Sequence, residues 1–189
     1  MKRLFSTTVH QSNNTEMADK LYEDSIEILS KIDIDEVKYK NGKTTYFEYT
    51  KLEDYSSYKN LMIYILDETK KYLNDLKVID IPVKITSIWL SEMNKGGSHT
   101  LHNHAGSILS GTFYINVPEN SGPICFQRHE WMSDPFLQLK FSEYSEVNIN
   151  MLRYNPKKGD ILIWKSDLPH TVLENNSDSR LAVSFNIGI

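Results

Sequence analysis

The sequence predicts an α+β fold in which amino-terminal helices buttress a jelly roll or sandwich of antiparallel β-strands. Apolar residues recur at helical spacing in two early segments, 14–32 and 54–76. From Ile81 onward, short runs rich in β-branched and aromatic residues are separated by Gly, Pro and Asn, as in antiparallel barrels. We expect a single domain over residues 1–189, with a mainly helical support in 1–80 and a jelly-roll core in 81–189.

Each expected element follows from local spacing. The first helix carries one apolar stripe with acidic residues toward its start, which is typical of a surface helix. The turn dipeptide Asn41-Gly42 favours a hairpin between the two helices. The apolar residues in 127–155 show neither helical nor strand spacing, and we expect an irregular insert over the barrel mouth. The expected strands are 83–90, 99–104, 110–117, 123–126, 161–164, 171–173 and 181–187.

Composition excludes several classes of partner. No apolar run approaches the roughly 20 residues of a membrane-spanning helix. The formal net charge is −4 and the 21 basic residues are scattered, so the chain lacks the basic stripe of a nucleic-acid-binding protein. Cys125 is the single cysteine, which excludes an internal disulfide. We therefore expect a cytoplasmic protein with a small-molecule or peptidyl substrate, and neither a nucleic-acid nor a membrane partner.

Three histidines have the spacing of a metal site. His102 and His104 are two residues apart in an expected strand, so both imidazoles project from the same face. His170 follows the apolar run 161–164 and a short turn, and is the best-placed third ligand. Three side chains on one face of an octahedral ion leave positions open for other ligands. His99, three residues before His102, is expected on the opposite face of that strand.

Two strands carry one polar and one apolar face. Thr112, Tyr114 and Asn116 alternate with apolar residues, and Arg180 begins a similar pattern near the end of the chain. An arginine inside a barrel needs an anionic partner, because an unpaired buried charge costs several kcal/mol. A dicarboxylate would provide that partner through bidentate hydrogen bonds. The expected co-substrate contacts are Arg180, Tyr114, Ser184, Asn116 and Asn186.

Two further side chains, Trp164 and Asp167, lie close in the sequence to the third expected ligand. Trp164 lies in the apolar run 161–164 and is expected to pack in the core. Asp167, three residues before His170, has the chemistry of an iron ligand, but its expected position in a loop argues against that role.

These residues together resemble the pattern of the iron(II)/2-oxoglutarate-dependent oxygenases of bacteria and phages. The resemblance is dense over residues 89–186 and thin before them, and its motifs are specific in combination. The matching residues are Trp89, His102, His104, Gly106, Ser107, Ser110, Gly111, Tyr114, Pro118, Gly122, Gly159, Asp160, Trp164, His170, Arg180, Ser184, Phe185 and Asn186.

The resemblance implies a double-stranded β-helix that binds ferrous iron through His102, His104 and His170. It further implies that Arg180 binds the distal carboxylate of 2-oxoglutarate and that Tyr114 supports the same molecule. The implied reaction is a hydroxylation with dioxygen, coupled to decarboxylation of 2-oxoglutarate to succinate.

One position departs from the wider superfamily, in which the triad contains two histidines and one carboxylate. His104 places a neutral ligand where the carboxylate would be, so the charge of the ferrous ion is less well offset. Two alternatives therefore stay open: a cupin-like three-histidine dioxygenase that does not use 2-oxoglutarate, and a metal-binding jelly-roll module without catalysis. Arg180 argues against the module, and succinate formation separates the two enzymes.

Overall fold

The computed structural model of the protein describes residues 6–33, 40–47, 50–129, 135, 139–145 and 148–189. The elements, in chain order, are β1 (Val9–Asn13), α1 (Thr15–Ser30), β2 (Gly42–Thr44), the 3₁₀ turn η1 (Leu52–Asp54), α2 (Ser56–Asp75), β3 (Lys84–Met93), β4 (His99–His102), β5 (Leu109–Asn116), β6 (Ile124–Gln127), β7 (Met151–Tyr154), β8 (Asp160–Lys165), β9 (His170–Val172) and β10 (Arg180–Gly188).

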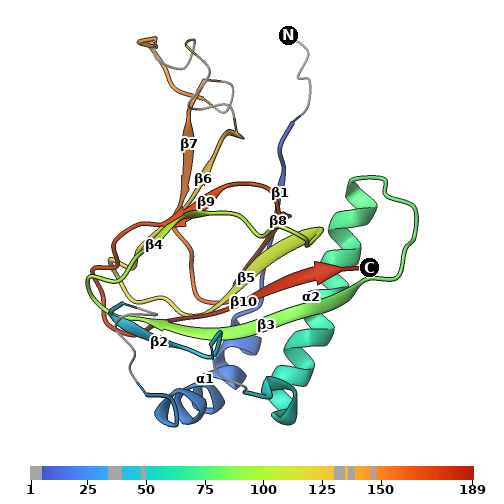
Figure 1. Ribbon diagram of the computed structural model, residues 1–189, viewed down its shortest axis with the longest axis vertical. Helices are drawn as coiled ribbons and strands as arrows, with labels where there is room; N and C mark the ends of the chain where they lie inside the picture. Colours follow the sequence, from blue (N-terminus) through green and yellow to red (C-terminus); the bar gives the residue numbers. More distant parts are fainter. Residues whose placement is uncertain (1–5, 34–39, 48–49, 130–134, 136–138, 146–147) are drawn as a thin grey trace.

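The strands form two antiparallel sheets that lie one over the other (Figure 1). The larger sheet has the order β1-β8-β5-β10-β3-β2, and the smaller has the order β4-β9-β6-β7. Neighbours in the sheets are distant in the sequence: Val9 in β1 pairs with Trp164 in β8, and Leu181 in β10 pairs with Asn116 in β5. The two layers make the double-stranded β-helix that the sequence pattern implied.

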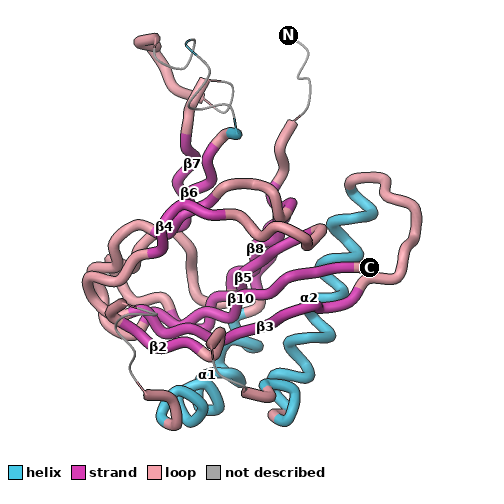
Figure 2. The backbone as a smooth tube through the Cα atoms, viewed as in Figure 1, coloured by secondary structure: helices cyan, strands magenta, loops and turns pink. Residues whose placement is uncertain are grey.

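The central strands of the larger sheet are buried on both faces. On the outer face, alternate residues of β5, β8 and β10 pack against α1 and α2, which both lie on that side of the sheet (Figure 2). Asn14 caps α1 by accepting a hydrogen bond from the backbone N–H of Met17 at 2.9 Å. The inner face contributes a second apolar cluster, which lines the space between the sheets. That cluster consists of Tyr114, Ile124, Phe126, Leu162, Trp164, Leu168 and Ala182.

Both expected helices and all seven expected strands are present, with ends shifted by a few residues. The prediction missed β1 and β7. β1 adds a strand from the segment expected to be mainly helical, and β7 is a regular strand inside the expected insert, paired with β6. The hairpin expected at Asn41-Gly42 lies partly outside the described residues, and its described arm, β2, pairs with β3.

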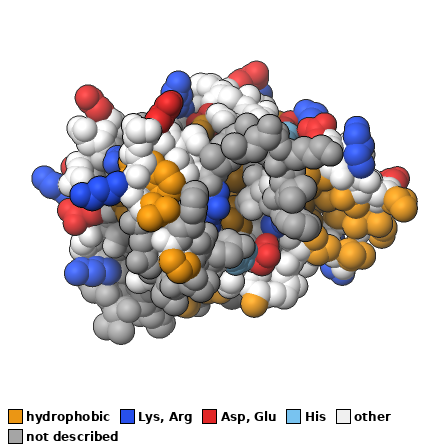
Figure 3. Space-filling view, turned by 90° about the horizontal axis from the view of Figure 1, so that it is seen from above, with side chains coloured by type: hydrophobic (Ala, Val, Ile, Leu, Met, Phe, Trp, Pro, Cys, Tyr) orange, Lys and Arg blue, Asp and Glu red, His pale blue; other side chains and the backbone are white. Residues whose placement is uncertain are grey.

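The surface is mixed in charge. Acidic and basic side chains are interspersed over the face shown in Figure 3, and hydrophobic side chains gather toward one end of it. Among the helices that the structure describes, none combines the length and the hydropathy of a membrane span.

Gly111 provides a test of the packing between β5 and its neighbours. A Cβ atom at this position would lie 2.3 Å from the ring of Phe185 and 2.6 Å from the carbonyl oxygen of Leu162. Because that carbonyl belongs to a paired strand, it cannot move easily. Gly111→Ala is therefore expected to lower the free energy of unfolding by about 3 kcal/mol, measured by chemical denaturation.

Gly106→Ala is the matched control for this prediction. Gly106 has a φ angle of +86° and no atom within 4 Å of an added Cβ, so only backbone strain of about 1 kcal/mol opposes the substitution. A loss at Gly111 no larger than the loss at Gly106 would contradict the packing argument.

Candidate metal and co-substrate site

Three histidines from two adjacent strands meet at one end of the inner space. His102 is the last residue of β4 and pairs across the sheet with His170, the first residue of β9. His104 follows β4, and its backbone N–H donates to the carbonyl of Ser166 at 2.9 Å, which holds the chain close to β8. One ligand atom from each of the three histidines lies within 4.8 Å of the others. The three imidazoles could therefore hold one metal ion.

Backbone carbonyls orient two of these rings. Nδ1 of His102 donates to the carbonyl of Thr100 at 2.7 Å, and Nδ1 of His170 donates to the carbonyl of Leu168 at 3.0 Å. A carbonyl can only accept, so the proton of each neutral ring lies on Nδ1 and the lone pair lies on Nε2. Such hydrogen bonds fix the tautomer and the direction of metal-binding histidines.

Burial favours the neutral form of two of the three histidines, His170 and His104. It lowers the pKa of His170 to about 3, although the hydrogen bond to Leu168 opposes that shift. The pKa of His104 is also lowered, first by burial and then by the charge of His102. Neutral imidazole is the form that binds metals, so at pH 7 neither His170 nor His104 has to release a proton to do so.

His99 does not lie on the opposite side from His102, as strict alternation predicted. The register between β4 and β9 shifts between these two residues, and their ring centroids are 5.9 Å apart. An irregularity of this kind changes the direction of side chains on one strand. Burial lowers the pKa of His99 to about 4, and the charges of His102 and Arg180 lower it further. His99 therefore borders the site, and the sequence alone gave no signal of the shift.

Arg180 and Tyr114 lie together inside the barrel. The exposed fraction is 5% for Arg180 and 0% for Tyr114, and the guanidinium carbon lies 5.0 Å from the centre of the tyrosine ring. Burial raises the pKa of Tyr114 to about 12, although the charge of Arg180 acts in the opposite direction. No carboxylate of the described residues forms an ion pair with Arg180, and its Nε and the phenol oxygen of Tyr114 lack hydrogen-bond partners.

The chemistry of this interior fits an anionic ligand rich in oxygen. Arg180 offers a fixed positive charge and donors only, and Tyr114 adds a hydroxyl. Leaving such groups buried without partners costs about 1–3 kcal/mol for each group. A dicarboxylate offers the oxygen acceptors and the negative charge that would satisfy these groups. 2-Oxoglutarate has this charge and these acceptors.

The other expected co-substrate contacts are less closely associated with Arg180. Ser184 faces the same interior, and its hydroxyl lies 3.1 Å from that of Thr112. Asn116 donates its amide to the carbonyl of Ser179 at 2.9 Å. Asn186 lies six residues along β10 from Arg180, about 20 Å at the rise of a strand. Its amide is hydrogen-bonded to Ser110 and Ser87, so the structure does not bring Asn186 together with Arg180.

The two acidic residues near the histidines have other partners. Asp160 begins β8 and accepts hydrogen bonds from Asn13, Tyr154 and the backbone of Lys157. Asp167 is exposed and lies 3.5 Å from the imidazole of His129. Neither belongs to the cluster of metal-ligand atoms that the described residues form.

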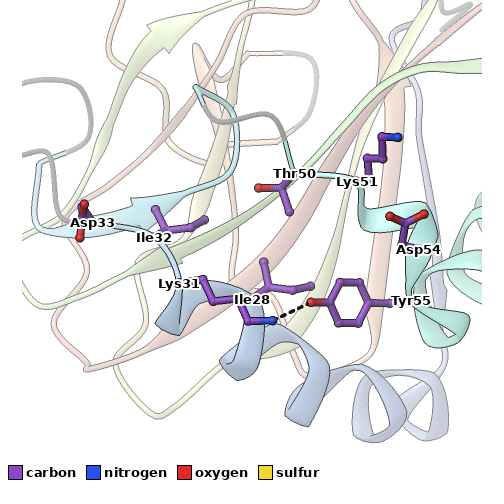
Figure 4. A pocket seen from close by; sticks show the side chains of 8 residues that line it. All are labelled: Ile28, Lys31, Ile32, Asp33, Thr50, Lys51, Asp54 and Tyr55. Atoms are coloured by element: carbon purple, nitrogen blue, oxygen red, sulfur yellow. Dashed lines mark hydrogen bonds between the residues drawn. The ribbon is translucent and has the colours of Figure 1, made fainter.

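A separate hollow of about 400 Å³ lies between the end of α1 and η1 (Figure 4). Lys31 and Tyr55 form a hydrogen bond of 3.3 Å on one side of it, and Lys51 and Asp54 also line it. None of the unpartnered buried polar atoms of the described residues lies in this hollow. The hollow thus lacks the unpartnered buried polar atoms that are found in the barrel interior.

Comparison with solved structures shows the same fold. A prolyl-4-hydroxylase from Pseudomonas putida aligns with a TM-score of 0.65 and 10% identity, over 96% of this chain and 92% of that one. HygX from Streptomyces hygroscopicus, solved with nickel, 2-oxoglutarate and hygromycin B, aligns with a TM-score of 0.66 and 12% identity, over 96% and 83%. A viral collagen prolyl hydroxylase from Paramecium Bursaria Chlorella virus-1, solved with 2-oxoglutarate, aligns with a TM-score of 0.59 and 13% identity, over 95% of this chain and 94% of that one.

Comparison of sequences gives the family. No curated protein matches the chain. The family model described as "Putative 2OG-Fe(II) oxygenase" matches residues 87–186, which are more than half of the sequence and include every residue of the site described above. The chain therefore belongs to the 2OG-Fe(II) oxygenase family, whose enzymes use ferrous iron, 2-oxoglutarate and dioxygen.

Proposed function

We propose that the protein is a hydroxylase in which His102, His104 and His170 hold ferrous iron and Arg180 anchors 2-oxoglutarate. The observation that carries this proposal is the buried Arg180, to which no described residue supplies an anionic partner, inside the same barrel as a cluster of three histidines. An arginine so placed is costly unless a ligand neutralises it. The enzymes of this family use 2-oxoglutarate, which supports that molecule as the ligand of Arg180.

The residues of the chain have separate roles in this proposal. The three imidazoles would hold the ferrous ion, and a site with three protein ligands would leave coordination positions open for other ligands. Arg180 and the hydroxyl of Tyr114 fix the distal carboxylate, with Ser184 further along the same strand. Bound iron supplies the activation of dioxygen, while the apolar cluster around Phe126 and Leu162 excludes water.

The substrate is proposed to enter beside the three histidines, near His129 in the expected insert 127–155, of which residues 130–134, 136–138 and 146–147 lie outside the described part of the chain. This placement treats the chain as one domain with an insert at the barrel mouth. The imidazole of His129 lies 3.5 Å from the carboxylate of Asp167, three residues before His170, and these exposed polar groups support a small-molecule or peptidyl substrate with polar groups. The buried thiol of Cys125 and the need for ferrous iron are consistent with a reducing, cytoplasmic compartment.

One observation favours the alternative enzyme, a three-histidine dioxygenase that does not use 2-oxoglutarate. His104 supplies a neutral ligand where the usual triad has a carboxylate, so the metal charge alone does not identify the co-substrate. Arg180 is the feature that the alternative leaves without a purpose.

An anaerobic titration separates these two enzymes. Protein loaded with ferrous iron is expected to develop a weak visible charge-transfer band when 2-oxoglutarate is added, and to release succinate when dioxygen is admitted. Protein loaded with Zn²⁺ is the control, because a d¹⁰ ion without redox chemistry gives neither result. Absence of the band and of succinate in the iron-loaded protein would overturn the proposed function.

A further inference from the structure

Trp164 has a polar atom inside the barrel that the proposed function leaves without a role. It lies on β8, its exposed fraction is 1%, and its side chain belongs to the inner apolar cluster with Tyr114. The ring lies edge-on to His170, with centroids 4.9 Å apart, and edge-on to Phe126 at 5.1 Å. The indole therefore packs in the core, as expected, and it also touches a proposed iron ligand.

The indole N–H of Trp164 has no hydrogen-bond partner among the residues that the structure describes. Four buried side-chain polar atoms of the described residues are unpartnered. Thr69 lies on α2, behind the larger sheet, and the other three, from Trp164, Tyr114 and Arg180, belong to the barrel interior. Trp164 and Tyr114 belong to one buried cluster, and the guanidinium of Arg180 lies over the Tyr114 ring. Unpartnered groups in one cluster indicate a ligand that satisfies them, because buried polar groups in proteins are nearly always paired.

The chemistry of the indole restricts what this partner can be. Nε1 is a donor only, so it requires an acceptor. The neighbouring rings of Phe126 and His170 do not provide one in the loaded protein. Phe126 has no polar atom, and the lone pair on Nε2 of His170 would bind the metal, because Nδ1 donates to Leu168. A phenylalanine would pack in this position without the cost of a buried N–H, which is about 1–3 kcal/mol. The donor is thus explained by an acceptor that arrives with the ligand.

We propose that Trp164 donates a hydrogen bond from Nε1 to an oxygen of 2-oxoglutarate, and that it is a third residue, beside Arg180 and Tyr114, that selects this co-substrate. The inference rests on the proposed function. It adds to that function a neutral donor on β8, next to the metal ligand His170. Arg180 is on β10 and Tyr114 is on β5, so the acid is held from three different strands.

Nuclear magnetic resonance of the Zn²⁺-loaded protein observes this hydrogen bond directly. The chain has three tryptophans, Trp89, Trp131 and Trp164, and their indole N–H signals are assigned by replacing each in turn with phenylalanine. On addition of 2-oxoglutarate, the Trp164 signal is expected to move downfield and to exchange more slowly with solvent. A shift caused by the metal alone, with no further change on adding the acid, would overturn the inference.

Binding measurements give the energetic test. Trp164→Phe is expected to weaken 2-oxoglutarate binding about tenfold, measured by anaerobic calorimetry on the iron-loaded protein, while the iron affinity is unchanged. Trp89→Phe is the matched control, since it removes an indole whose ring lies 5.8 Å from that of His104, and its effect is expected to be smaller. Equal effects of the two variants would contradict a specific role for Trp164.

The same measurements separate this inference from the proposed function. If the wild-type protein binds 2-oxoglutarate through Arg180 but Trp164→Phe binds it equally well, the role of Trp164 is wrong and the function stands. If the wild-type protein does not bind 2-oxoglutarate at all, both fail. A thermal unfolding scan of each variant verifies that the barrel is folded.

Discussion

His170→Ala is expected to reduce the affinity for ferrous iron by roughly 100-fold or more. Loss of a residue that only hydrogen-bonds to a metal ligand lowers the affinity by up to about 100-fold, and loss of the ligand itself should cost at least as much. The reason is geometric, because His170 is the only member of the three-histidine cluster contributed by β9, while the other two come from β4 and the residues after it. Succinate formation should fall to background at limiting iron. Metal content after dialysis and anaerobic titration with iron measure the loss.

Two other variants make this result specific. His129→Ala removes an exposed histidine that pairs with Asp167, and it should bind iron as the wild type does. His104→Asp restores the usual anionic ligand, and it should keep the metal and bind it at least as tightly, because the carboxylate offsets part of the ionic charge. Loss of iron from His129→Ala, or no loss from His170→Ala, would show that the metal is held elsewhere.

Arg180→Met is expected to raise the 2-oxoglutarate concentration needed for half-maximal activity by roughly 100- to 1000-fold, the equivalent of about 3–4 kcal/mol. Methionine keeps much of the volume and removes the charge that would pair with the distal carboxylate. Iron binding should change little, since Arg180 is not among the metal-ligand atoms. Kinetics over a range of 2-oxoglutarate concentrations, with iron saturating, provide the measurement.

The thermal stability of Arg180→Met without ligand is a second, independent test of the role of Arg180. A buried arginine without a partner destabilises the empty protein, so Arg180→Met is expected to raise its melting temperature. Arg153→Met is the matched control, because Arg153 is exposed on β7, where its Nε donates to the side chain of Asn155 at 3.3 Å. Equal losses of iron and of 2-oxoglutarate binding in Arg180→Met would show that the residue supports the fold and not the co-substrate.

The sequence predicted the strands that carry the site, because their alternation of polar and apolar residues reflects burial on one or both faces. The convergence of His102 and His104 was also predicted, but part of the reason was wrong. β4 ends at His102, and a backbone hydrogen bond to Ser166 holds His104 close to the other two histidines. The same limit applies to His99, where a shift in register defeats simple alternation.

Other features depended on contacts between distant segments. β1 has no strong apolar alternation of its own, and it becomes a strand because it pairs with β8. β7 is similarly determined by its pairing with β6. The lack of a partner for the Trp164 indole could not be predicted either, since it depends on which acceptors surround the ring after folding.

The pairing of β1 with β8 has a consequence for biosynthesis. Val9 meets Trp164, so the first strand cannot complete its hydrogen bonds until most of the chain has left the ribosome. At roughly 5–20 residues per second, that delay is on the order of 10 s. During this interval the larger sheet lacks β8 and β10, two of the strands whose outer faces α1 and α2 cover. Arg180 emerges later still, so the proposed anchor for 2-oxoglutarate is present only after β10 has been made.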